Sequence, residues 1–229
     1  MITLMIPAKG GVGNSLLTRF FALNRKADLL IDGAFGRRGQ DLHHGVEDEI
    51  LFDLFDYLSE SVEIQEAICK TEHYDLLLAS QTRNLNEIAP EQFYDKIDEL
   101  KNKYDEIIVD LSHWQVTDLK YWLKTADQII IVAEDDVEAY RGIDQIQFLC
   151  WQDRLRLNVK LLFNKVSNRE TENKVKNFIE EKELDLYGIV PKVTDTDQIK
   201  LYQLNEYTYG GEKRSFIDRL FRGVNNDQS

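Results

Sequence analysis

Hydrophobic residues occur along the chain in short continuous runs separated by longer amphipathic segments. The runs, rich in Ile, Leu and Val, cover residues 2–7, 27–32, 74–80, 104–111, 126–134, 157–166 and 186–191. Since apolar and polar residues do not alternate within them, the runs predict strands that are covered on both faces, as in a parallel sheet.

Between these runs, apolar residues recur three or four positions apart, which predicts helices. The predicted helices cover residues 15–26, 47–68, 89–104 and 141–157. Alternation of strand and helix predicts an α/β fold: a doubly wound, mostly parallel sheet with helices on both faces. We expect one domain over residues 1–222 and a frayed polar tail over residues 223–229.

The segment PAKGGVGNSLLT, residues 7–18, lies between the first strand and the first helix and nearly matches the phosphate-loop pattern G-x-x-x-x-G-K-[ST]. Gly13 and Ser15 fit the pattern, but Asn14 stands where the lysine belongs. The glycines would let backbone N–H groups point at a phosphate, and the Ser15 hydroxyl would contact Mg²⁺. Asn14 can form hydrogen bonds but carries no positive charge. The alternative is a glycine turn that binds nothing.

The segment KGGVGNS resembles the deviant Walker motif of the MinD/ParA family, K-G-G-x-G-K-[ST]. The resemblance implies a P-loop NTPase fold, ATP and Mg²⁺ as cofactors, and a homodimer formed through the nucleotide face. Lys9 stands at the family's signature lysine, which reaches the partner's nucleotide. The implied nucleotide contacts are Lys9, Gly10, Gly11, Val12, Gly13, Asn14, Ser15 and Leu16.

Residues 29–46, LLIDGAFGRRGQDLHHGV, resemble the family's switch I segment. Asp32 and Gly36 fall in register, whereas Ala34 replaces an aspartate that helps to position the attacking water or the metal. Lys9 and Asp32 are therefore the candidate catalytic residues. Because Asn14 and Ala34 both remove parts of the hydrolytic site, we expect ATP binding with weak or no hydrolysis.

Three later segments resemble the rest of the family's nucleotide site. Asp110 ends a buried strand in a switch II-like segment and would hold Mg²⁺ through a water; the alternative is an aspartate that caps the strand end. Asn164, in FNKV, matches the residue that reads the adenine edge. Pro191 and Lys192 belong to a segment that resembles the loop against the base.

A narrower similarity, to the CpaE/TadZ branch of Tad pilus assembly proteins, covers residues 104–146. The matching positions are Asp110, Leu111, Trp114, Ala126, Asp127, Val132, Glu134 and Arg141. Proteins of this branch usually carry a receiver-like domain before the part that this chain resembles. The resemblance implies a dimeric protein that positions pilus assembly or polar-localisation proteins.

Charge and composition limit the partners, metals and cell compartments that fit this chain. The net charge of −13 argues against a broad nucleic-acid-binding face, and His43 and His44 are adjacent residues, which rarely ligate one metal. Two cysteines and the lack of a recognisable signal peptide or membrane span favour the cytoplasm. The basic, amphipathic residues 212–222 predict either a last helix packed on the sheet, which we favour, or a peripheral membrane contact.

Two alternatives remain open to the function expected above, which is a dimeric protein that binds ATP and hydrolyses it weakly or not at all. The first is an active MinD/ParA-like ATPase in cell-division or partition positioning, in which Lys9 or another cation replaces the missing lysine. The second is a nucleotide-free scaffold that dimerises through the same face. Turnover distinguishes the active ATPase, and nucleotide affinity distinguishes the scaffold.

Overall fold

The computed structural model of the chain describes residues 1–48, 50–155, 157–192, 207–209 and 212–214. The main sheet has eight strands in the order β3-β4-β2-β5-β1-β6-β7-β8. Their bounds are β1 Ile2–Pro7, β2 Leu29–Asp32, β3 Ile68–Lys70, β4 Asp75–Leu77, β5 Ile107–Asp110, β6 Gln128–Ala133, β7 Asn158–Val166 and β8 Asp185–Pro191. Only β3 pairs antiparallel in this sheet, so the predicted doubly wound, mostly parallel α/β fold is confirmed.

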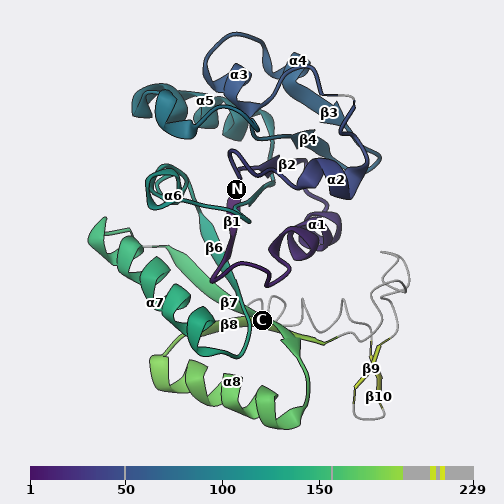
Figure 1. The fold of residues 1–229 in the computed structure, drawn as a ribbon, viewed down its shortest axis with the longest axis vertical. Helices are drawn as coiled ribbons and strands as arrows, with labels where there is room; N and C mark the ends of the chain where they lie inside the picture. The colour runs from purple at the N-terminus through teal and green to yellow at the C-terminus, as the bar shows by residue number, and fades with distance from the viewer. Residues whose placement is uncertain (49, 156, 193–206, 210–211, 215–229) are drawn as a thin grey trace.

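Helices cover both faces of the sheet (Figure 1). They are α1 Asn14–Arg25, α2 Gln40–His44, α3 Leu54–Leu58, α4 Ile64–Ala67, α5 Pro90–Lys103, α6 Val116–Leu123, α7 Val137–Gln152 and α8 Arg169–Lys182, with a 3₁₀ turn at Leu85–Glu87. Two apolar clusters follow from this arrangement. One cluster joins the sheet to α3 and α5–α8, and the other joins the opposite face to α1.

The helix predicted over residues 47–68 is wrong, because this stretch holds two short helices and the start of β3. Asp53 begins α3 by accepting hydrogen bonds from the backbone N–H groups of Phe55 and Asp56, and a second capping box at Glu63 begins α4. Each cap satisfies the free N–H groups of a new helix end, which divides the amphipathic stretch.

The carboxyl ends of the parallel strands meet at one edge of the sheet, where ligands bind in doubly wound folds. β1 lies between β5 and β6, and the glycine loop follows it directly. In the pairing of β2 with β5, Asp32 lies opposite Asp110. The topology therefore brings the loop and both candidate carboxylates to the same edge.

The carboxyl-terminal expectations are tested only in part. Glu212–Arg214 forms a strand, β10, antiparallel to β9 (Tyr207–Tyr209), so a helix beginning at residue 212 is wrong. Residues 215–222 and the tail 223–229 lie outside the described residues, and the single-domain division stays a prediction. Within the part of the chain that the structure describes, no helix is long and apolar enough to cross a membrane.

Candidate nucleotide site

The glycine loop has the backbone conformation that a phosphate cradle requires. Gly11 and Gly13 have φ angles of 77° and 84°, in the left-handed region that favours glycine, and α1 starts at the next residue. A cavity of about 270 Å³ lies against the loop and the start of α1; it is lined by Pro7, residues 11–16, His43 and Ser112. Backbone N–H groups at a helix start attract anions, so the loop fits a phosphate group.

Two side chains at the end of β7 donate hydrogen bonds to backbone carbonyls of the glycine loop. The Asn164 amide donates to the backbone oxygen of Val12 at 2.7 Å, and the Lys165 ammonium donates to that of Gly11 at 2.6 Å. Lys165 also pairs with Glu134 at 2.7 Å. These contacts fix the loop carbonyls on the side away from the cradle. They also engage the Asn164 amide, so adenine recognition by this residue stays a prediction.

Lys9, for which the resemblance implies the signature-lysine role, pairs with Asp136 of its own chain at 2.8 Å. The hydrogen bond from Lys9 to Asp136 raises the lysine pKa, so Lys9 stays charged. Asp136 also accepts from the Ala139 N–H and thereby caps α7. The lysine is one-fifth exposed and would have to leave Asp136 to reach a partner's nucleotide.

Asn14, in the position of the usual lysine, contacts the switch II aspartate. Its side-chain nitrogen donates to Asp110 Oδ1 at 2.7 Å and to the Met5 carbonyl at 3.1 Å. The amide nitrogen must face Asp110, because a carboxylate only accepts hydrogen bonds. Asn14 therefore reaches into the sheet edge, towards Asp110 and the end of β1.

Gln40, which the sequence did not single out, contacts the same carboxylate. Its amide nitrogen donates to Asp110 Oδ2 at 2.6 Å and to the Ser15 carbonyl at 3.0 Å. The Ser112 N–H donates to Asp110 Oδ1 at 2.9 Å, and the Ser15 side chain forms a further hydrogen bond with this carboxylate. Both oxygens of Asp110 are thus engaged, and the residue is fully buried.

Asp32 places Gln40 at this point. Its carboxylate accepts from the backbone N–H groups of Ala34, Gly39 and Gln40 at 2.8–2.9 Å. These contacts fold switch I back over β2 and fix the start of α2. Asp32, proposed from the sequence as a catalytic residue, therefore has an evident structural role, while a catalytic role stays a prediction.

The pKa values of the Asp32 and Asp110 carboxyl groups are both raised in the folded chain. Loss of water, followed by the neighbouring Asp110 charge, raises the pKa of Asp32 to about 7. Burial likewise raises the pKa of Asp110. Two adjacent buried carboxylates resist full ionisation. Because Asn14 is neutral, no lysine of the glycine loop offsets their charge.

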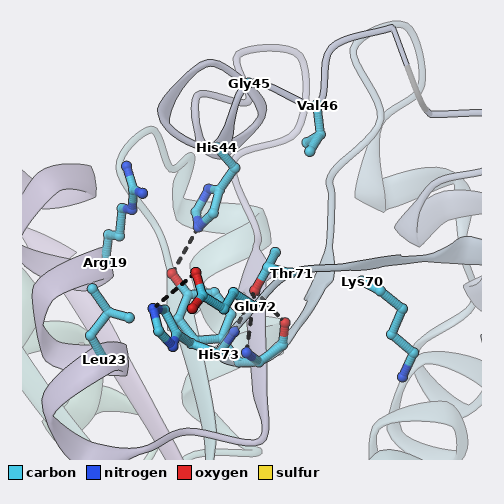
Figure 2. Close-up of a pocket in the computed structure, with 10 residues that line it drawn as sticks. Arg19, Leu23, His44, Gly45, Val46, Lys70, Thr71, Glu72 and His73 are labelled. Atoms are coloured by element: carbon cyan, nitrogen blue, oxygen red, sulfur yellow. Dashed lines mark hydrogen bonds and ion pairs between the residues drawn. The ribbon is translucent and has the colours of Figure 1, made fainter.

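A second cavity, of about 410 Å³, lies on the other side of α2 (Figure 2). His43 lines the loop cavity, whereas the adjacent His44 points into the second one beside Arg19 of α1. His44 contacts the Gln40 carbonyl through Nδ1 at 2.6 Å and the Tyr74 hydroxyl through Nε2 at 2.7 Å. Burial lowers the pKa of His44, which favours the neutral ring in this position.

The remaining predicted residues also lie at this edge. Pro191 pairs with Val166 at the end of β8, and the Lys192 N–H donates to the Val166 carbonyl at 2.9 Å. Their partner Val166 directly follows Asn164 and Lys165, the β7 residues that hold the loop. Ala34 is fully buried and offers no polar group.

The arrangement fits the phosphates of a nucleotide better than it fits a divalent ion. Gly10 and Gly11 have open space where a Cβ would stand, as a phosphate cradle requires. Mg²⁺ needs oxygen ligands that are free to bind it or its waters. Asp110, one of the two predicted metal residues, instead accepts hydrogen bonds from the Ser15 side chain and from the amides of Asn14 and Gln40. Among the described residues, no group of three His, Cys, Asp or Glu side chains could hold a metal.

Several MinD proteins are similar to this chain in sequence and in fold. The septum site-determining protein MinD of Bacillus subtilis is 29% identical over 203 residues, which is 83% of this chain and 75% of that protein. The MinD subunit of the Aquifex aeolicus MinC:MinD complex superposes with a TM-score of 0.69 at 26% identity, over 84% of this chain and 82% of that one. The chain is thus similar to MinD proteins in both sequence and fold.

Other comparisons define how far this similarity reaches. A plasmid partition protein of Borrelia burgdorferi bound to AMPPNP shares the fold, with a TM-score of 0.74 at 20% identity over 96% of this chain and 94% of that one. No protein-family model matches. The alignments with three further MinD relatives span 57–64% of the length of those proteins. Activity and partners are therefore matters for proposal.

Proposed function

We propose that this MinD/ParA-like protein is a nucleotide switch of low activity: it binds ATP at the glycine loop, dimerises through the face that carries Lys9, and hydrolyses ATP weakly or not at all. The observation that carries the proposal is the loop itself, with left-handed Gly11 and Gly13 beside a cavity at the start of α1. The Borrelia relative bound to AMPPNP and the Aquifex MinC:MinD complex support nucleotide binding and protein partnership as the general pattern.

Weak hydrolysis follows from the missing charges. A lysine at position 14 would stabilise the charge that develops on the phosphates, and an aspartate at position 34 would help to position the water or the metal. Asn14 instead donates to Asp110, and Ala34 is an apolar buried residue. Among the residues that line the loop cavity, only His43 can carry a positive charge. This composition disfavours the active-ATPase alternative.

The cellular role that we propose is the one that the CpaE/TadZ resemblance implies: a cytoplasmic dimer that positions Tad pilus assembly or polar-localisation proteins. Asp127 and Glu134, two matched positions, have structural contacts here. Asp127 accepts from the Ile2 N–H at 2.6 Å, and Glu134 holds Lys165. The net charge of −13 supports protein partners over nucleic acid. Membrane contact through residues 212–222 remains a second proposal, which vesicle sedimentation would test.

The proposal is tested by calorimetry with ATP and by sedimentation velocity with and without ATP. We expect binding, together with a shift from monomer to dimer. Lys9→Ala should abolish the shift but leave a measurable affinity, because Lys9 contacts Asp136 rather than its own loop. Lys174→Ala, which removes a lysine from an exposed ion pair on α8, is the matched control. Absence of ATP binding would refute the switch and favour the nucleotide-free scaffold.

A further inference from the structure

Both oxygens of Asp110 already accept hydrogen bonds, and the Ser15 side chain adds a further one to this carboxylate. Asn14 and Ser112 donate to Oδ1, Gln40 donates to Oδ2 at 2.6 Å, and the carboxylate is fully buried. Hydrogen bonds to a charged acceptor are the stronger kind, and at a buried site water does not replace them when they break. A metal-bound water would therefore compete with these donors for the lone pairs of Asp110.

Gln40 is fixed in this position from three directions. Asp32 accepts from its backbone N–H at 2.9 Å, and the Ser15 carbonyl accepts from its side chain at 3.0 Å. His44 contacts its backbone carbonyl from the second cavity, where the ring lies between α2 and the turn at residues 70–74 (Figure 2). The Gln40 amide is therefore held at Asp110 by the fold of switch I.

The residues also explain how Asp110 stays hydrogen-bonded without a loop lysine. Two neutral amides, one backbone N–H and the Ser15 side chain satisfy the carboxylate without adding charge. The phosphate cradle does not depend on Asp110, because it consists of backbone N–H groups and the start of α1. Phosphate binding and the usual metal position are thus separated in this chain.

We propose that the side-chain amides of Asn14 and Gln40 take the place of a divalent metal at Asp110, so that the glycine loop binds nucleotide phosphates without Mg²⁺. This inference rests on the proposed nucleotide binding. It assigns Gln40 as a positioning residue that the family resemblance did not indicate. The ligand class is a nucleoside diphosphate or triphosphate in its metal-free form.

The test is calorimetry of the full chain with ADP, once with Mg²⁺ and once with EDTA. ADP is the probe because it carries less charge than ATP and is not hydrolysed. We expect the two dissociation constants to agree within about twofold, a difference of less than 0.5 kcal/mol. A tightening of about tenfold or more by Mg²⁺ would overturn the inference and leave the proposed switch intact. No binding under either condition would overturn both.

Substitution of Gln40 provides a second test of the inference. Gln40→Met keeps the length of the side chain but frees Asp110 Oδ2, and Gln40→Ala frees it with a smaller side chain. We expect Mg²⁺ to tighten ADP binding in at least one folded variant by about fivefold or more. Gln65→Ala, an exposed glutamine on α4, is the matched control and should bind ADP equally with and without Mg²⁺. Folding of each variant is checked by circular dichroism.

Manganese gives a readout that does not depend on affinity for ADP. Mn²⁺ mixed with ADP and the wild-type chain should show no protein-bound electron paramagnetic resonance signal beyond that of the Mn²⁺–ADP complex. The folded Gln40 variant should show one. A bound signal in the wild type would contradict the inference, as would a Gln40 variant that remains indifferent to both metals.

Discussion

Asn14→Lys restores the family's loop residue and tests what its loss has changed. In the wild type the side chain is 4% exposed and donates to Asp110 at 2.7 Å and to the Met5 carbonyl at 3.1 Å. A lysine at this position brings a positive charge to the start of α1. A charge-assisted contact with phosphate contributes about 1.5–3 kcal/mol, so ATP should bind about 10- to 100-fold more tightly.

Turnover should rise much less than affinity in the same variant. Ala34 still lacks the carboxylate, and Gln40 still holds Asp110 Oδ2 at 2.6 Å. Affinity is measured by calorimetry and turnover by phosphate release. Asn24→Lys, the same substitution ten residues further along α1, is the control. Unchanged ATP affinity would show that position 14 is not the family's lysine position, and full turnover would show that the switch I register at Ala34 is wrong.

Two further predictions concern stability. Gly142→Ala should lower the free energy of unfolding by about 2–3 kcal/mol in urea titrations, because a Cβ there would lie 1.7 Å from the Ala8 carbonyl oxygen, whereas Gly39→Ala has open space and should cost less than about 1 kcal/mol. Because burial raises the pKa of Asp32 from 3.8 to about 7, the folded chain binds this proton more tightly than the unfolded chain. The free energy of unfolding should therefore fall as the pH rises from about 4 to 7, by at most about 1.4 kcal/mol per pH unit, and Asp32→Asn should flatten this slope; an equal slope in the variant would contradict the assignment.

The sequence predicted the sheet and the loop because both depend on local signals. Continuous Ile, Leu and Val runs identify strands buried on both faces, and a glycine loop between the first strand and a helix marks the sheet edge. The prediction of one helix over residues 47–68 was wrong because it relied on the spacing of apolar residues. It did not use the capping residues Asp53 and Glu63, which mark two separate helix starts. Gly142 stands within a predicted helix, where a glycine can indicate close packing. The structure shows that its neighbour is the Ala8 backbone.

Gln40 was not predictable in the same way. Its partner Asp110 is 70 residues away, and their contact requires switch I to fold back over β2. The only local signal is a polar residue within the switch I-like segment, and that signal does not reveal burial. The orientation of Asn14 was equally hidden, since the pattern predicts a side chain directed at phosphate, whereas the structure directs it at Asp110.

Asn14 and Gln40 together supply hydrogen-bond donors to Asp110 in a loop that has no lysine at position 14. A lysine lost from a buried acidic site would leave Asp110 short of donors and beside Asp32, which costs free energy. Here two amides supply those donors, although the carbonyl oxygens Asn14 Oδ1 and Gln40 Oε1 find no partner among the described residues. An unsatisfied buried acceptor costs about 1–3 kcal/mol, which is comparable to the gain from each bond to a carboxylate. The network therefore adds little net stability, and its effect is to hold switch I against the loop in one position. If position 14 is the family's lysine position, the proposed switch has exchanged a charged partner of the phosphates for a neutral partner of Asp110, and this exchange is the reason that we propose binding without efficient hydrolysis.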